Sequence, residues 1–264
     1  MNMRYHGGKT RIGKSISEKI QFIIDNSGVL INGYIEPFCG MCGVFVHVVH
    51  KTNLPSYIAS DNNASVIKMW EDLRDGWRPD IENFNKTKFI EMKGDGNSSS
   101  SKGFFGHAMT FGALYFQCYR QDLHHLLEYS MRDIVKRSKI LEKVEFRSCD
   151  YKSILTEKKI QNKLIFCDPP YETISRYYDE FNNRLSFDSD EFWILCENMS
   201  KKNIVVISEK KDFFHDRLSK YDGKSCMINL PNRINRFGKT SKSSDEYICV
   251  ITHLDICMKG LYVT

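Results

Sequence analysis

Short apolar runs alternate along the chain with stretches in which apolar residues recur every three or four positions. The short runs predict buried strands, and they lie at residues 33–36, 57–61, 144–147, 164–167 and 203–208. The helical spacing predicts helices over residues 14–27, after Gly43, and from about Ser189 onward. Strands and helices that alternate in this way are typical of an α/β protein built on a largely parallel sheet.

The stretch from Asp75 to Lys139 interrupts this alternation. Residues 94–103 are rich in glycine and serine, which predicts a mobile loop. An aromatic-rich segment follows over residues 104–119, and most of its rings are expected in the core. A polar loop beside such a segment could contact phosphates or base edges of a nucleic acid, and Lys102 and Arg120 are the cations placed to do so.

Composition narrows the class of protein. The chain has 264 residues, of which 41% are hydrophobic and 27% charged, as in an ordinary globular protein. It has neither an apolar run of the roughly 20 residues that span a bilayer nor a signal peptide. We therefore expect no membrane partner and an intracellular, cytoplasmic protein. Nine irregularly placed cysteines fit reduced thiols in that compartment, and the net charge of +5 is compatible with a polyanionic partner.

The strand predicted over residues 164–167 ends in an unusual way, on Asp168, Pro169, Pro170 and Tyr171. Two prolines stiffen the backbone and remove its N–H donors. The Asp168 carboxylate and the Pro169 carbonyl would form a rigid pair of acceptors for an exocyclic amino group, with Tyr171 stacked on its ring. Holding both hydrogens would aim the nitrogen lone pair at an electrophile and stabilise the developing positive charge. A plain strand-ending turn is the alternative interpretation.

A second candidate site is the glycine-containing turn over residues 36–43, between a predicted strand and a predicted helix. In doubly wound α/β proteins this first turn binds nucleotide-like cofactors, because the backbone can approach the ligand closely. Asp61 ends the next predicted strand, at the position that contacts ribose hydroxyls in such folds.

Two other motifs suggest different chemistry. Residues 8–15 match the phosphate-binding Walker A pattern of nucleoside triphosphatases, but such a loop needs a buried strand before it and none is predicted there. A hydrolase of this kind would lose activity in Lys14→Ala. Cys39 and Cys42 form a C-x-x-C pair, yet the sequence contains no second pair. Two buried thiols that pack a tight turn account for this pair better than a metal site, and we expect no metal.

Taken together, the motifs resemble the Dam-like, D12-class family of DNA adenine-N6 methyltransferases. Tyr5–Lys9 is similar to that family's N-terminal motif, Glu36–Gly40 to its cofactor turn, Asp61 to its ribose-binding acid, and Asp168–Tyr171 to its Asp-Pro-Pro-Tyr catalytic motif. The order of the motifs is also the family's order. The resemblance implies a Rossmann-like methyltransferase fold with an inserted, mainly helical target-recognition region.

The resemblance also implies boundaries and roles. Residues 1–75 and 140–264 would form the catalytic domain and residues 76–139 the target-recognition insertion. The cofactor would be S-adenosylmethionine. Its implied contacts are Tyr5, Lys9, Glu36, Phe38, Gly40, Asp61, Asp150 and Asp168. The catalytic residues would be Asp168, Pro169, Pro170 and Tyr171. Arg233, Arg236 and Lys239 lie in a basic stretch that could touch phosphates, with a merely solvated loop as the alternative.

The expected function is methyl transfer to N6 of an adenine flipped out of duplex DNA, with or without a separate restriction endonuclease as partner. Three alternatives stay open: cytosine-N4 methylation, an RNA substrate, and a DNA-binding module that has lost catalysis. Asp168 argues against the release-factor glutamine methyltransferases, whose similar motif begins with Asn.

One departure from the family concerns the cofactor turn. The family's turn usually reads Phe-x-Gly-x-Gly, and Cys42 occupies the second glycine position. If that position requires a positive φ, a cysteine there is strained, and cofactor affinity is the property most exposed to the change.

Overall fold

The computed structural model describes residues 3–170, 187–230 and 246–256. Its centre is a seven-stranded sheet in the order β3-β2-β1-β4-β5-β7-β6. The strands are β1 (Tyr34–Glu36), β2 (Tyr57–Asp61), β3 (Glu145–Ser148), β4 (Leu164–Cys167), β5 (Ile204–Lys210), β6 (Lys224–Asn229) and β7 (Glu246–Thr252). Strands β1 to β5 pair in parallel, whereas β7 is antiparallel to both of its neighbours. All five predicted strands are confirmed.

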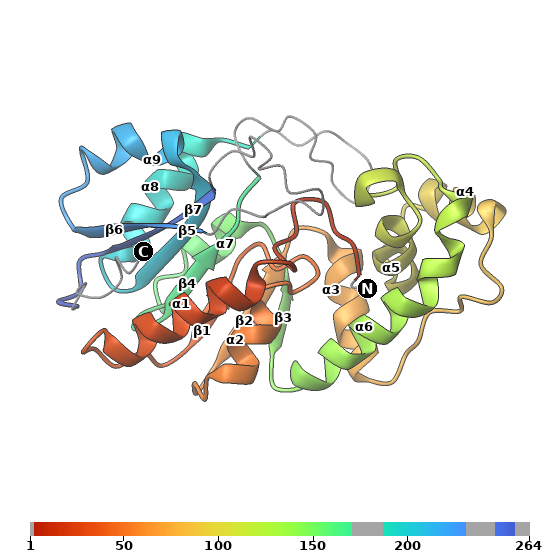
Figure 1. The fold of residues 1–264 in the computed structure, drawn as a ribbon, viewed down its shortest axis with the longest axis horizontal. Helices are drawn as coiled ribbons and strands as arrows, with labels where there is room; N and C mark the ends of the chain where they lie inside the picture. Colours follow the sequence, from red (N-terminus) through yellow and green to blue (C-terminus); the bar gives the residue numbers. More distant parts are fainter. Residues whose placement is uncertain (1–2, 171–186, 231–245, 257–264) are drawn as a thin grey trace, which may run out of the picture.

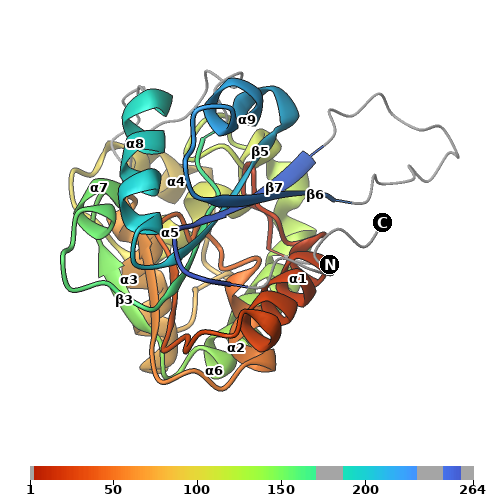
Figure 2. The same cartoon turned by 90° about the vertical axis from the view of Figure 1, so that its left-hand side faces the viewer.

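Helices cover both faces of the sheet, as Figure 2 shows with α1 and α8 on opposite sides. The helices that pack on the sheet are α1 (Gly13–Asn26), α2 (Phe45–Lys51), α3 (Ala64–Arg74), α7 (Tyr151–Leu155), α8 (Ser189–Ser200) and α9 (Lys211–Leu218). Helices α1, α2 and α3 share one hydrophobic core, and α7, α8 and α9 share the other. Alternate residues of β4 enter alternate cores, Phe166 the first and Ile165 the second, as the two-residue period of a strand requires.

The fold is a doubly wound, Rossmann-like sheet. Strand order reverses between β1 and β4, which are adjacent in the sheet although distant in sequence. Ligands of such folds bind outside the carboxyl ends of the strands at this reversal. The residues that directly follow β1 and β4 therefore lie where a ligand is expected.

Between α3 and β3 the chain forms the insertion, which stands beside the sheet in Figure 1. It contains α4 (Lys86–Gly94), α5 (Ser100–Ala108), η1 (Phe111–Ala113), η2 (Gln121–Leu126) and α6 (Leu127–Ile140). All of residues 76–139 are described, none belongs to the sheet, and the segment is mainly helical. The loop predicted over 94–103 is shorter than expected, because Ser99 caps α5 by accepting a hydrogen bond from the backbone N–H of Lys102.

Candidate active site

Three carboxylates gather at the carboxyl ends of neighbouring strands. Glu36 is the last residue of β1, Asp61 the last of β2, and Asp168 directly follows β4. Strand β1 pairs in parallel with both β2 and β4, so all three residues leave the sheet at the same edge. The sequence predicted each as a site residue, and the structure brings them together.

Asp168 forms a buried ion pair with Lys9 from the N-terminal loop. The Nζ of Lys9 lies 2.7 Å from Oδ1 of Asp168, and their side chains are 8% and 17% exposed. Burying either charge without its partner would cost several kcal/mol. This pair therefore joins the N-terminal loop directly to the predicted catalytic motif, although more than 150 residues separate the two in sequence.

Glu36 is more deeply buried than Asp168. The Tyr34 hydroxyl donates a 2.6 Å hydrogen bond to its Oε1 from the same face of β1. Burial raises the pKa of Glu36 well above its usual range; the bond from Tyr34 opposes the rise and the negative charge of Asp168 adds to it. The site thus contains one carboxylate held by a cation and one held by a neutral hydroxyl.

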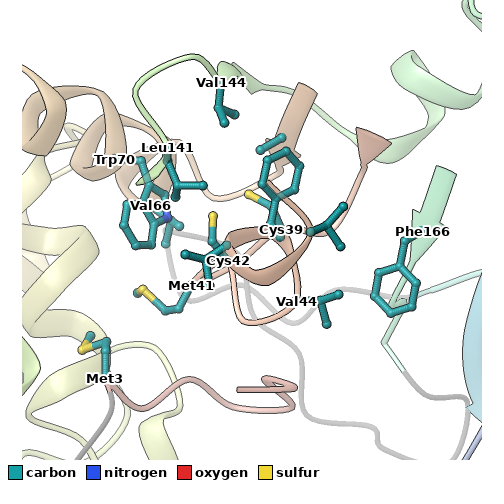
Figure 3. Packing of buried hydrophobic residues seen from close by; sticks show 14 of the residues in the cluster. Met3, Cys39, Met41, Cys42, Val44, Val66, Trp70, Leu141, Val144 and Phe166 are labelled. Atoms are coloured by element: carbon teal, nitrogen blue, oxygen red, sulfur yellow. The ribbon is translucent and has the colours of Figure 1, made fainter. Parts of the chain in front are cut away.

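The turn over residues 38–43 is fixed mainly through its backbone. The Gly40 N–H donates to Oδ2 of Asp61 (2.9 Å), and the Gly40 carbonyl accepts from Nε1 of Trp70 (3.0 Å). The Cys42 N–H donates to the Cys39 carbonyl (2.7 Å). Figure 3 shows Met41 and Cys42 of this turn in one hydrophobic cluster with Trp70 and Leu141. A turn held at successive peptides presents a fixed backbone surface to a ligand.

Cys42 has a φ of +53° and is fully buried. The condition under which a cysteine at this position would be strained, a positive φ, is therefore met. A residue with a Cβ pays about 1–2 kcal/mol for this conformation, and the burial of its side chain beside Met41 offsets part of that cost. The chain therefore keeps a strained residue inside the candidate cofactor turn.

The Asp61 carboxylate is hydrogen-bonded to the turn. Its Oδ2 accepts from Gly40 and its Oδ1 accepts from the backbone N–H of Asn63 (2.9 Å). Burial raises the pKa of Asp61, and these two hydrogen bonds oppose the rise. Because a carboxylate has about four lone-pair sites, it retains acceptor capacity for hydroxyl groups of a ligand.

The remaining predicted cofactor residues lie around the turn. The ring of Tyr5 lies over Gly40, where an added Cβ would meet Cε1 of Tyr5 at 2.6 Å. The ring of Phe38 stacks on Tyr151 with centroids 5.1 Å apart. Asp150 precedes Tyr151 and caps α7 by accepting from the backbone N–H of Lys152. The structure thus places all eight predicted cofactor contacts around the carboxyl ends of β1 to β4.

Of the five predicted DNA contacts, the structure describes two, Lys102 and Arg120. Lys102 is only 1% exposed, and its Nζ donates to the carbonyls of Asp95 (2.7 Å) and Asn97 (2.8 Å). Its assignment as a phosphate contact was wrong, because the ammonium is buried and holds the loop before α5 through these two carbonyls. Arg120 is on the surface and forms a two-point pair with Asp122. Arg233, Arg236, Lys239 and the predicted catalytic residue Tyr171 lie outside the described residues.

Sequence reasoning did not foresee that Phe111 of the insertion is exposed. Phe111 is 61% exposed, and the guanidinium of Arg120 lies 5.5 Å from the centre of its ring. Arg4 donates a 2.9 Å hydrogen bond to the Thr110 carbonyl, which ties this loop to the N-terminal segment that carries Tyr5 and Lys9. Nothing in the sequence distinguishes Phe111 from the buried rings around it.

The two rival motifs find no structural support. Residues 3–12 form turns and no strand, so the Walker-like segment has no strand to lead into it. Gly13 instead starts α1 against the Gly43 carbonyl, which an added Cβ would meet at 2.1 Å. Cys39 and Cys42 are buried free thiols. Within the described ranges no group of three potential metal-ligating side chains is present, and no helix there is long and apolar enough to cross a membrane.

Comparison with known proteins decides the family. The model of the D12 class N6 adenine-specific DNA methyltransferase family matches residues 5–107 and 114–227, which is most of the chain. The chain belongs to this family. The methyltransferase uses S-adenosylmethionine as its cofactor. No curated protein sequence matches it.

Several solved structures are distantly similar to the methyltransferase. The human methyltransferase 10 domain containing protein is 9% identical over 92% of this chain and 83% of its own, with a TM-score of 0.46. The N-terminal domain of human METTL16 in complex with SAH is 9% identical over 91% and 68%, with a TM-score of 0.43. A precorrin 8W decarboxylase from Methanobacterium thermoautotrophicum is 10% identical over 91% and 90%, also with a TM-score of 0.43. Likenesses this low identify no substrate for the methyltransferase.

The residues present fit this cofactor chemically. S-adenosylmethionine carries an ammonium, a sulfonium, a carboxylate and ribose hydroxyls. Glu36, Asp61 and Asp168 would supply acceptors for the cationic groups and the hydroxyls, and Lys9 would supply a cation for the carboxylate. Gly40, with a φ of +44°, leaves the backbone of the turn bare on the side that faces Tyr5.

Proposed function

We propose that the methyltransferase transfers the methyl group of S-adenosylmethionine to N6 of an adenine flipped out of duplex DNA. One observation carries the choice of an exocyclic amine: Asp168, Pro169 and Pro170 leave β4 at the reversal of strand order, with the Asp168 carboxylate oriented by Lys9. The family description supports N6 of adenine and DNA.

The proposed chemistry uses the chain's own groups to prepare the amine. Oδ1 of Asp168 is held by Lys9, and the carboxylate has further acceptor capacity for one amino hydrogen. The Pro169 carbonyl would accept the other hydrogen, and Tyr171 would stack on the base. The cofactor supplies an electrophilic methyl group on its sulfonium. As the N–C bond forms and the S–C bond breaks, Asp168 stabilises the positive charge on nitrogen until a proton leaves to water.

Contact with a nucleic acid is supported by the surface of the insertion. Phe111 and Arg120 offer a stacking face and a cation on a loop anchored to the N-terminal segment through Arg4. Adenine N6 is inaccessible to a methyl donor inside the stack, so the target base must leave the duplex. An exposed aromatic group beside a cation suits contact with bases and phosphates.

Methylation of duplex DNA with labelled S-adenosylmethionine tests the proposal. We expect N6-methyladenine after digestion to nucleosides, and a loss of about 10²–10³-fold in rate for Asp168→Ala at saturating cofactor. The variant should still bind duplex DNA, which separates lost chemistry from lost binding. Label on cytosine, label only on RNA, or no label from native protein that binds both ligands would each overturn the proposal.

A further inference from the structure

Arg137 belongs to α6, the last helix of the insertion, but its side chain reaches the candidate cofactor turn. Its Nη1 donates a 2.7 Å hydrogen bond to the Met41 carbonyl, 96 residues away in sequence. Its Nη2 lies 2.7 Å from Oδ2 of Asp133, one helical turn earlier. Both side chains are largely buried. A buried guanidinium is costly unless it is paired, and here its two partners fix its direction.

The same ion pair holds a second segment. Oδ2 of Asp133 also accepts a 2.8 Å hydrogen bond from the backbone N–H of Met3. Met3 is buried two residues before Tyr5, which lies over Gly40. The pair Asp133–Arg137 therefore fastens both the turn over 38–43 and the start of the N-terminal loop to one face of α6. Figure 3 shows Met3, Met41 and Leu141, which follows α6, in the same cluster.

The contact to Met41 bears on the strained residue. The φ angle of Cys42 measures rotation relative to the peptide that joins Met41 to Cys42. Arg137 holds the carbonyl of that peptide, and the Cys39 carbonyl holds its N–H at 2.7 Å. A strained backbone persists only where its surroundings over-determine it. Here both polar ends of the peptide before Cys42 are fixed.

We propose that Arg137, oriented by Asp133, is a positioning residue of the cofactor site that holds the Met41–Cys42 peptide in its strained conformation. It touches no reacting atom, and it acts through the shape of the turn. The proposal rests on the assignment of the turn over 38–43 to the cofactor. It does not depend on which base receives the methyl group.

Calorimetric binding of S-adenosylhomocysteine, without DNA, tests the proposal. Arg137→Gln should raise Kd about tenfold or more, the loss expected for a hydrogen bond from a charged donor. Arg137→Lys should recover part of the affinity, because an ammonium can still donate to the Met41 carbonyl. Arg132→Gln is the matched control: it lies on the same helix, is 68% exposed and pairs only with Glu128 among the described residues. Its Kd should equal that of the native protein.

A double-mutant cycle with Cys42→Gly separates positioning from general stability. Glycine adopts a φ of +53° without strain, so Arg137→Gln should cost several-fold less affinity in the Cys42→Gly background. If Arg137→Gln fails to fold alone, the comparison uses Arg137→Lys in both backgrounds. An unchanged Kd, or equal losses in both backgrounds, would overturn the proposal. Methyl transfer to a base other than adenine would leave it intact.

Discussion

Glu36 is the most deeply buried of the three carboxylates of the site. The residue is 3% exposed, and it accepts a 2.6 Å hydrogen bond from the Tyr34 hydroxyl. Because burial lifts its pKa well above the ordinary value of 4.5, the folded protein binds this proton more tightly than the unfolded chain. The free energy of unfolding therefore falls as the pH rises above about 4.5. The ionised carboxylate therefore lowers the stability of the free protein at higher pH.

Glu36→Gln should consequently stabilise the free protein and weaken cofactor binding. The amide oxygen still accepts from Tyr34, while no charge has to be buried. We expect Tm to rise by about 2–4 °C at pH 8, which corresponds to about 1 kcal/mol in a chain of this size, and the gain to shrink toward pH 5. Scanning calorimetry at both pH values checks this, with the exposed Glu18→Gln as control. A gain that is equal at both pH values would contradict the explanation.

At the level of single residues, the sequence predicted what depends on local pattern. Asp168 and Asp61 were recognisable because each ends an apolar run. The sequence raised a positive φ at Cys42 only as a condition, and the structure supplies its value. Local pattern did not predict the surroundings of Lys102 and Arg137. Whether a cation faces water or a carbonyl depends on chain segments brought beside it by folding, and both cations are buried against backbone carbonyls.

Among the elements, the loop around η1 combines rigidity with an exposed ring. The Phe111 N–H donates to the Cys118 carbonyl and the Phe116 N–H to the Gly106 carbonyl, so the loop is closed on itself and on α5. Gly112 has a φ of +63° with open space around it. A loop held this firmly while Phe111 stays exposed is suited to present that ring to a partner.

Phe111→Ala should therefore weaken duplex DNA binding without loosening the fold. Stacking on an aromatic side chain contributes about 1–3 kcal/mol per base, so we expect roughly a tenfold or greater loss of affinity by fluorescence anisotropy. S-adenosylhomocysteine binding and Tm should not change. Ile194→Ala on α8 removes a comparably exposed apolar side chain far from the insertion and serves as the control. Equal DNA affinity of Phe111→Ala and native protein would exclude the loop as a contact.

The regular elements were largely predictable, and the insertion was predictable only in outline. Every strand of the parallel part was visible as an apolar run with a clear end. The bounds of α5 were not, because Ser99 to Gly103 read as a flexible loop although Ser99 is a helix cap. Gly103 is needed for packing: an added Cβ would lie 2.2 Å from the Ser65 carbonyl of α3. A glycine that is required by contact with a distant segment cannot be recognised from the residues next to it in sequence.

Over the whole molecule, the insertion is not separated from the catalytic part by a boundary in the core. Trp70 of α3, Phe104 of α5 and Ile134 of α6 belong to one continuous cluster that also contains Phe166 of β4. The buried pair Asp133–Arg137 and the close contact of Gly103 with α3 add polar and steric links. A region joined in this way should not unfold before the sheet.

Two tryptophans allow this to be measured. Trp77 packs against the core that includes the insertion, and Trp193 of α8 lies in the core on the other face of the sheet. Each variant would keep one of these two tryptophans, with the other tryptophans replaced by phenylalanine. Its unfolding in urea would be followed by fluorescence and by far-UV circular dichroism. Within each variant we expect the two probes to give the same midpoint. An earlier transition at Trp77 would instead show a separately folding insertion. Coincidence would mean that the insertion belongs to the same folded unit as the cofactor turn. The proposed DNA contact at the insertion would then stabilise that turn as well.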